Sequence, residues 1–319
     1  MFDPYLGKFT TDMWEWWKAN GYEVKVDRYY DPELVDWADV IWFDTCDNNL
    51  FSATNPSEAL LDDWRFENRN VPWDIHDHDL SKKKVIVRPI DIEVWQGHHA
   101  HDKMWDVVDD CIFIAPHIRT LFLEDSRPHE SDMKLHTIPC GVNVDKYGFK
   151  VRGHGHQIGI VSEVWESKGV DLVLQIALRL KDIDPRYEIH WLGKLQDYHW
   201  DQKYTSDFIE RNKLPITFHD WVDSVDEFLE DKNYLLHASK KEAFSYATAE
   251  AMAKGIKPVL HHFYGAEDLW PGLTWNSIDT AIFEITRGEY DSQSYRDYLS
   301  VMGYTVPDMM NRIEGVING

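Results

Sequence analysis

The segment KEAFSYATAEAMAKGIKPVL, residues 241–260, decides how the second half of the chain folds. Its central residues are strong helix formers, and Gly255 stands where a left-handed glycine commonly ends a helix. Ser245 is of a type that caps the start of a helix, and the apolar residues after Gly255 are typical of a buried strand. The segment therefore predicts a helix over residues 246–254, followed by a strand over residues 257–260.

Two glutamates, Glu242 and Glu250, lie eight positions apart in this segment. Eight residues at about 100° each return to nearly the same side of a helix, so both carboxylates could line one cleft. The N–H groups at the start of the helix would face that cleft, an arrangement that suits a phosphate. A capped amphipathic helix with two solvated glutamates explains the spacing equally well.

The composition indicates a folded, acidic protein. The chain has 319 residues, of which 43% are hydrophobic and 14% aromatic, which suits two globular domains. Its net charge is −23, and acidic residues outnumber basic ones in both halves, so duplex DNA and anionic lipid are not expected partners. We therefore expect a protein without a nucleic-acid partner.

Cysteine usage and hydropathy indicate a soluble protein. Cys46, Cys111 and Cys140 lie far apart, which favours reduced thiols over a disulfide framework or a zinc site. No apolar run approaches the roughly 20 residues that span a bilayer, and the N-terminus has no basic stretch before an apolar core. We expect a cytoplasmic protein with no transmembrane segment.

Strand-like and helix-like segments alternate on both sides of a glycine-rich joint near residues 151–155, which predicts two α/β domains with parallel sheets. In such domains ligands bind beyond the carboxyl ends of the strands and in the cleft between domains. We place the domains at residues 1–150 and 151–292, with a helical segment over 293–319 that could cross back to the first domain. The expected strands are residues 22–26, 39–44, 84–89, 111–115, 136–139, 158–161, 187–192, 216–218, 234–236 and 257–260. The expected helices are residues 11–20, 169–180, 224–230 and 246–254.

Four stretches carry a family pattern in a fixed order: IPCGVN at residues 138–143, a glycine-containing loop with Lys168-Gly169 over residues 158–171, a strand that ends in Gly193, and residues 242–255 with their two glutamates. Together they resemble the motifs of family 4 of the retaining glycosyltransferases, the last being its E-x7-E donor motif. The resemblance covers residues 136 to about 270 well and the first domain loosely. It implies the GT-B fold, in which two Rossmann-like domains face each other across a cleft.

The resemblance implies a retaining glycosyltransferase that moves a sugar from a UDP- or GDP-sugar to a small-molecule or glycan acceptor. It implies neither a metal nor another cofactor. Lys168 would contact the diphosphate, Glu250 the ribose and Glu242 the transferred sugar, and stabilising the leaving diphosphate would be the main catalytic effect. The implied catalytic residues are Glu242, Lys168 and Asp91. The implied donor-binding residues are Lys168, Gly193, Trp221, Val222, Glu242, Phe244, Ser245, Tyr246, Ala247 and Glu250.

The chain departs from the family pattern at two places. Glu163 stands where the family has an arginine. The first domain lacks the usual opening strand, and Asp91 or Glu93 stands near the position of the family's histidine. These departures keep open a relative that binds a nucleotide sugar, or a partner protein, without transferring the sugar. A glycosyltransferase that acts on modified DNA bases is a further alternative, which the acidity of the chain disfavours.

Histidines and tryptophans give weaker indications. His98, His99 and His101 resemble a metal cluster, but neighbouring side chains point apart on a helix or a strand, so a surface or acceptor-binding role is favoured. His261 and His262 follow a strand near the expected donor cleft, where either could approach the substrate. Exposed tryptophans commonly stack on sugars. The candidates for acceptor binding are Trp64 and Trp73.

Overall fold

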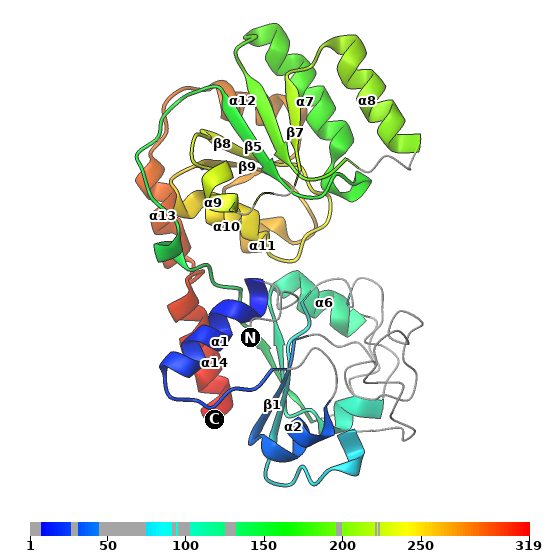
Figure 1. Cartoon of the computed structure of the whole chain (residues 1–319), viewed down its shortest axis with the longest axis vertical. Coiled ribbons are helices and arrows are strands. Elements are labelled where there is room, and N and C mark those ends of the chain that lie inside the picture. Colours follow the sequence, from blue (N-terminus) through cyan, green and yellow to red (C-terminus); the bar gives the residue numbers. More distant parts are fainter. Residues whose placement is uncertain are drawn as a thin grey trace. The chain divides into compact units, whose positions relative to one another are not determined.

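The chain forms two compact units in a computed structural model (Figure 1). Unit 1 comprises residues 1–140 and 306–319, and unit 2 comprises residues 141–305. The structure thus groups residues 141–150 with unit 2, and it assigns the C-terminal helical region partly to each unit. The structure describes residues 8–26, 31–44, 75–90, 94, 103–124, 132–195, 200–220, 222 and 224–319.

Unit 1 is built on a four-stranded parallel sheet in the order β1-β2-β3-β4. Short apolar runs form the first three strands, as the sequence predicts, whereas the fourth, KLHT, has one apolar residue and begins two residues before the expected strand. The strands are β1 (Val40–Phe43), β2 (Lys84–Val87), β3 (Asp110–Phe113) and β4 (Lys134–Thr137). The helices are α1 (Lys8–Ala19), α2 (Pro32–Trp37), α6 (Pro116–Glu124) and α14 (Val306–Asn318), with single 3-10 turns at Ile75–Asp77 and Lys103–Val107.

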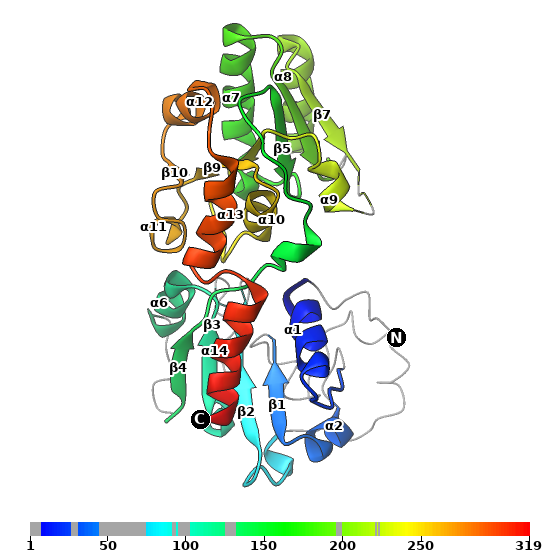
Figure 2. The same cartoon turned by 90° about the vertical axis from the view of Figure 1, so that its left-hand side faces the viewer.

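The C-terminal helix belongs to the core of unit 1. Met309, Met310 and Ile313 of α14 pack in one cluster with Met13 of α1 and Ile86 of β2. All five side chains are essentially buried. The last helix of the chain therefore completes a core whose strands come from its first half (Figure 2).

The expected strand over residues 22–26 is wrong. These residues follow α1 without regular structure. Tyr22 and Val26 are both exposed, so the alternating apolar pattern has no buried face to occupy. A strand also needs a partner for its backbone N–H and C=O groups, and the Tyr22 N–H instead donates to the carbonyl of Trp17.

Unit 2 contains a six-stranded parallel sheet in the order β10-β9-β8-β5-β6-β7. The chain runs outward from β5 through β6 to β7, and then returns to the other side of β5 at β8. The point where the order reverses therefore lies between β5 and β8, and ligands of such sheets bind at this point. The strands are β5 (Gln157–Val161), β6 (Glu188–Leu192), β7 (Ile216–His219), β8 (Tyr234–His237), β9 (Lys257–His261) and β10 (Thr274–Trp275).

Helices cover both faces of this sheet. Tyr234 and Leu236 of β8 pack in the cluster that contains α7 and α12, whereas Leu235 packs in a cluster with Ala251 of α10. Because successive side chains of a strand point to opposite faces, His237 lies on the same face as Leu235. The helices are α7 (Val170–Ile183), α8 (Trp200–Asn212), α9 (Val225–Phe228), α10 (Tyr246–Ala253), α11 (Ala266–Leu269), α12 (Ile278–Thr286) and α13 (Ser292–Val301), with 3-10 turns at Val144–Lys146 and Glu166–Lys168.

The two ends of α10 differ from each other. Gly255 has φ +79°, and its N–H donates to Met252 while the N–H of Ile256 donates to Ala251, which confirms the expected glycine stop as a Schellman motif. Ser245 stands at the N-cap position, but the expected side-chain cap is wrong. Its φ is +71° and its hydroxyl bonds the hydroxyl of Thr248 at 2.8 Å, not a backbone N–H.

The glycine stop can be tested by substitution. A Cβ at Gly255 would lie 2.8 Å from the Lys150 carbonyl oxygen and 2.8 Å from the Phe149 ring, in addition to the cost of a positive φ. We expect Gly255→Ala to lower the free energy of unfolding by about 2 to 4 kcal/mol in urea titrations. Gly272→Ala is the matched control, because Gly272 has φ +78° but open space around it. It should cost only about 1 to 2 kcal/mol, and equal losses in the two variants would contradict the close contact.

Candidate functional site

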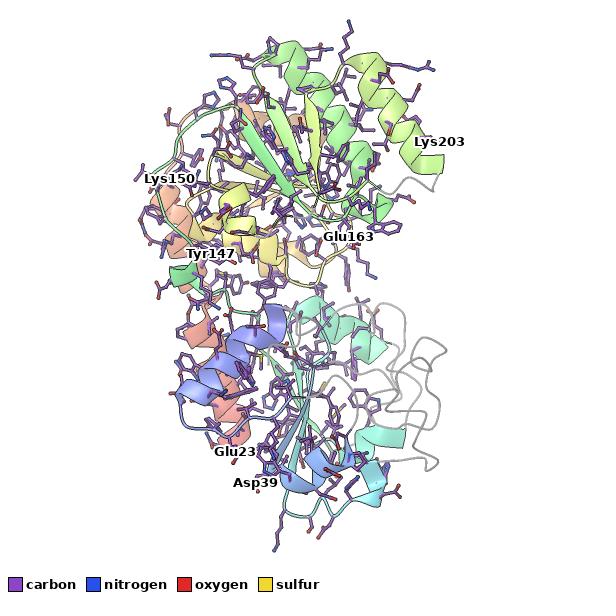
Figure 3. The ribbon with its side chains drawn as sticks, in the orientation of Figure 1. Glu23, Asp39, Tyr147, Lys150, Glu163 and Lys203 are labelled. Carbon is purple, nitrogen blue, oxygen red and sulfur yellow. The ribbon has the colours of Figure 1, made fainter. Side chains whose placement is uncertain are left out.

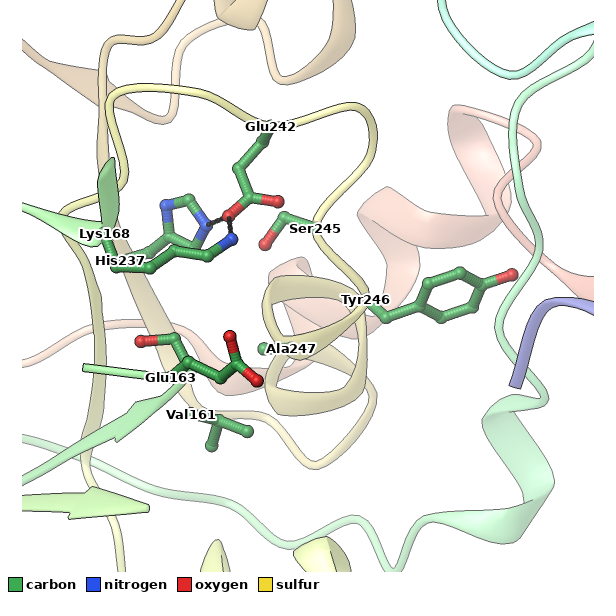
Figure 4. A pocket seen from close by; sticks show the side chains of 9 residues that line it. Val161, Glu163, Lys168, His237, Glu242, Ser245, Tyr246 and Ala247 are labelled. Atoms are coloured by element: carbon green, nitrogen blue, oxygen red, sulfur yellow. Dashed lines mark hydrogen bonds and ion pairs between the residues drawn. The ribbon is translucent and has the colours of Figure 1, made fainter. Parts of the chain in front are cut away.

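A pocket of about 320 Å³ opens at the carboxyl ends of β5 and β8 in unit 2 (Figure 4). It therefore lies at the point where the strand order reverses, as expected for a ligand site of a parallel sheet. Its wall is completed by the end of the 3-10 turn at residues 166–168 and by the loop before α10. The lining residues are Val161, Ser162, Glu163, Lys168, His237, Glu242, Ser245, Tyr246 and Ala247.

Two glycines let the backbone segments around the pocket approach each other. A Cβ at Gly169 would lie 2.0 Å from the carbonyl oxygen of Ala238, the residue after β8. A Cβ at Gly193 would lie 2.0 Å from the carbonyl oxygen of Ser162 in the pocket wall. Gly193 is therefore placed behind the wall of the pocket, where only a residue without a side chain fits.

An ion pair occupies the centre of the pocket. The Lys168 ammonium lies 2.5 Å from Oε1 of Glu242, and Nε2 of His237 lies 3.4 Å from the same oxygen (Figure 4). The side chains of Glu242 and Lys168 are 14% and 27% exposed, and that of His237 is 8% exposed. Two nitrogen groups thus converge on one carboxylate oxygen in a half-enclosed site.

The pKa of Glu242 reflects this arrangement. Burial alone raises the pKa, but the hydrogen bond and charge of His237 and the charge of Lys168 outweigh it and lower the pKa to about 2. The carboxylate is therefore ionised at any pH at which the protein would function. It can accept hydrogen bonds but cannot donate a proton.

A second carboxylate, Glu163, lines the pocket from the loop after β5 (Figure 3). In Figure 4 its carboxyl group points toward the first turn of α10, near Ala247. The Trp165 indole N–H donates to Oε2 of Glu163 at 2.5 Å. The lining of the pocket therefore contains two carboxylates and one lysine. Its net side-chain charge is less positive than that of an anion site built from basic side chains.

The first turn of α10 faces the pocket through Ser245, Tyr246 and Ala247. N–H groups in the first turn of a helix have no partner within the helix, and the helix dipole gives this end a partial positive charge. No acidic side chain stands in the first turn of α10. This backbone therefore contributes positive potential that the side-chain balance lacks.

The structure brings together five of the residues expected to bind a donor. Lys168, Glu242, Ser245, Tyr246 and Ala247 all line the pocket. Their roles toward a ligand stay predictions.

Three other expected residues have different surroundings. The ring of Phe244 is buried against Trp270, and Val222 is exposed. Glu250 is 1% exposed and is not among the residues that line this pocket. Its Oε1 accepts a hydrogen bond of 2.7 Å from the hydroxyl of Tyr147, which lies in the segment that enters unit 2 (Figure 3). Glu242 therefore lines this pocket and Glu250 does not, although both were expected to line one cleft.

Several expected residues lie outside the part of the chain that the structure describes. Asp91 and Trp221 are among them. So are the three histidines of the HHAH stretch and both tryptophans proposed for acceptor binding, which are His98, His99, His101, Trp64 and Trp73. The described residues contain no group of three or more His, Cys, Asp or Glu side chains placed to hold a metal ion. Among the described helices, none has the length and apolar character needed to cross a bilayer.

His237 is a pocket residue that the sequence patterns did not indicate. It ends the apolar strand β8, and a polar residue directly after a buried run in a parallel sheet is the signal that could have found it. Within the described residues, Nδ1 of His237 is buried and has no hydrogen-bond partner. Leaving such a group unsatisfied costs about 1 to 3 kcal/mol.

The pocket lies within a segment that matches a known family. The model described as Glycosyl transferases group 1 matches residues 155–274, which contain every lining residue of the pocket. No curated protein matches the chain. The family match thus covers the greater part of unit 2.

Solved structures show the same fold over most of the chain. A TarM mutant from S. aureus, in complex with fondaparinux, α-GlcNAc-glycerol and UDP, is 13% identical over 77% of this chain and 53% of its own, with a TM-score of 0.61. HepE of Anabaena in complex with UDP is 14% identical over 75% of this chain and 73% of its own, with a TM-score of 0.58. A glycosyltransferase from Rickettsia africae is 12% identical over 92% of this chain and 83% of its own, with a TM-score of 0.57.

These likenesses establish the fold. The chain has the GT-B fold, with α/β units built on parallel sheets, which confirms the expected fold class. It spans only about half the length of TarM, 53% of that chain.

The ion pair in the pocket makes stability depend on pH. The pKa of Glu242 falls from an ordinary 4.5 to about 2 on folding, so its contribution is complete above about pH 4.5 and is lost as the pH falls toward 2. We expect Glu242→Gln to lower the free energy of unfolding by about 1 to 3 kcal/mol at pH 7, and the loss should shrink between pH 4.5 and pH 2.5. Glu166→Gln, at an exposed acid in the neighbouring turn, is the control. Urea titrations at several pH values measure both. A loss that is the same at pH 7 and pH 3 would show that Glu242 has an ordinary pKa.

Proposed function

We propose that the chain is a glycosyltransferase that takes a sugar from a nucleotide-diphosphate sugar and passes it to an acceptor, with the pocket of unit 2 as its donor site. The observation that carries the proposal is the position of the pocket. It lies at the reversal of strand order, inside the segment that matches the group 1 glycosyl transferases, with Lys168 and the first turn of α10 on its wall.

Each part of the pocket has a role in this proposal. The diphosphate would accept hydrogen bonds from the first turn of α10 and from Lys168. Lys168 would exchange its contact with Glu242 for a phosphate oxygen, and Glu242 would then accept hydrogen bonds from hydroxyls of the sugar. The bond between the sugar and the diphosphate breaks with its electron pair leaving on the diphosphate, so donors aimed at that oxygen lower the barrier.

The resemblance to family 4 supports the finer parts of the proposal, which are transfer with retention, no metal, and Glu250 as the partner of the ribose. TarM and HepE have been solved in complex with UDP, which favours UDP over GDP as the first nucleotide to test. The acceptor would be a small molecule or a glycan. Cys111 is a buried free thiol, which supports a cytoplasmic location.

Nucleotide binding tests the donor site directly. We expect UDP or GDP at 100 times its dissociation constant to stabilise the protein by about 2.7 kcal/mol in thermal shift assays. In calorimetric titrations Lys168→Gln should weaken nucleotide binding by about 10- to 100-fold, because it removes a charged hydrogen bond to the diphosphate. Lys240→Gln is the control, since Lys240 pairs with Asp171 and does not line the pocket. If neither UDP, GDP nor their sugars shift the wild type, the donor site is refuted.

A second candidate function is a binder of nucleotide sugars that does not transfer the sugar. Glu163 favours it, because this carboxylate lines a pocket that would receive a diphosphate. Hydrolysis of the donor by the wild type, measured as released sugar, excludes this candidate. Binding without hydrolysis supports it.

Reversing the charge of Glu163 separates the two candidates further. We expect Glu163→Arg to tighten UDP binding by about tenfold, because it removes a repulsive charge and adds an attractive one. If the wild type binds without turnover, a gain of hydrolysis in the variant would identify Glu163 as the cause. Glu166→Arg makes the same change of charge nearby, outside the pocket lining, and it should alter binding by less than about threefold. Equal changes of UDP affinity in the two variants would show that the net charge of the region matters and the position of Glu163 in the pocket does not.

A further inference from the structure

We propose that His237 is a positioning residue for Glu242, holding its carboxylate toward the sugar of the donor when Lys168 engages the diphosphate. The inference rests on the proposed function. It concerns only the sugar half of the donor site, so it makes a prediction that the nucleotide-binding tests do not.

The fold holds His237 beside Glu242. His237 is the last residue of β8, on the face of the sheet that α10 covers, and its side chain is 8% exposed. Its Nε2 lies 3.4 Å from Oε1 of Glu242 (Figure 4). The ring of Phe263 packs against the imidazole at 6.1 Å between centroids. A strand end and a packed ring hold this nitrogen in place, whereas Glu242 lies in a loop.

One ring nitrogen of His237 is buried at a cost in stability. A neutral imidazole has one donor and one acceptor nitrogen, and His237 uses Nε2 toward Glu242 while Nδ1 is buried without a partner in the described part of the chain. A leucine would fill the site without burying an unsatisfied nitrogen. Residues that break a local stability rule concentrate at functional sites, and among the described residues the contact with Glu242 is the one polar contact that the structure shows for this ring.

Lys168 and His237 would act on different groups once the donor is bound. Lys168 and His237 approach the same oxygen of Glu242. Lys168 cannot serve both Glu242 and a diphosphate at full strength, because its ammonium is a single point charge. His237 remains beside Glu242 after Lys168 turns to the diphosphate. It would then be the group that keeps the carboxylate ionised and fixed in orientation as the sugar hydroxyls arrive.

Charged and titratable groups surround this contact. Glu163, Lys168 and Glu242 line the same pocket, and His261 of β9 lies on the neighbouring strand. Burial lowers the pKa of His261, and the charge of His237 lowers it further.

The experiment compares UDP with a UDP-sugar that the wild type binds, in the full chain. In His237→Leu we expect the dissociation constant of UDP to stay within threefold of the wild type, and kcat/KM for the UDP-sugar to fall by about 10- to 100-fold. The fall should be mainly in kcat. The melting temperature without ligand is measured beside these constants, because leucine removes both the unsatisfied nitrogen and the contact that stabilises the Glu242 carboxylate. His237→Gln, whose amide can donate to Glu242, should recover part of kcat.

His262→Leu is the matched control, because His262 is half exposed and is not among the residues that line the pocket. It should change none of these quantities. A less stable His237→Leu protein with unchanged kcat/KM would show a structural role and overturn the inference. If the wild type binds UDP and the UDP-sugar but the His237→Leu variant keeps the wild-type kcat/KM for the UDP-sugar, the inference alone fails. If the wild type binds no nucleotide, the proposed function fails and the inference fails with it.

Discussion

The order of strands in unit 2 is the constraint on which the rest of the site depends. Because all six strands are parallel, their carboxyl ends lie at one edge of the sheet. The chain continues from β5 to β6 on one side and from β8 to β9 on the other, so the loops that follow β5 and β8 diverge. The pocket occupies that divergence. Lys168 and Glu242 are 74 residues apart in sequence, yet they meet there because each follows one of these two strands. No local preference of either segment could bring the two together.

Helix α10 shows how the fold separates stability from ligand binding. At its C-terminal end Lys254 is fully buried and pairs with Asp226 at 2.5 Å, Arg152 donates to the carbonyl of Lys254, and Arg296 donates to the carbonyl of Ala253. These cations satisfy the last carbonyls and complement the helix dipole. At the other end neither a side-chain cap nor an acidic residue of the first turn occupies the N–H groups. The helix is thus anchored at one end and leaves the other end to the pocket.

The sequence could predict what depends on neighbouring residues. Helix α10, its stop at Gly255 and strand β9 follow from composition and order, because helix propensity and a left-handed glycine act over a few residues. The left-handed backbone of Ser245 could not be predicted, since its type favours an ordinary side-chain cap. The contact of His237 with Glu242 depends on where β8 ends and on the path of the loop after it. That information is in the tertiary structure and not in the spacing of the residues.

The charges of the pocket also explain why Lys168 and Glu242 are paired. Lys168 contributes one positive charge, and Glu163 and Glu242 contribute two negative ones, so the side chains sum to −1 when His237 is neutral. A half-buried lysine without a partner would carry an uncompensated charge, and Glu242 compensates it in the free protein. An incoming diphosphate would therefore replace one anion by another beside Lys168, instead of filling a vacant cationic site. Once Lys168 turned to the diphosphate, the Glu242 carboxylate would face the pocket without that partner. The hydroxyl groups of a sugar would then donate hydrogen bonds to it.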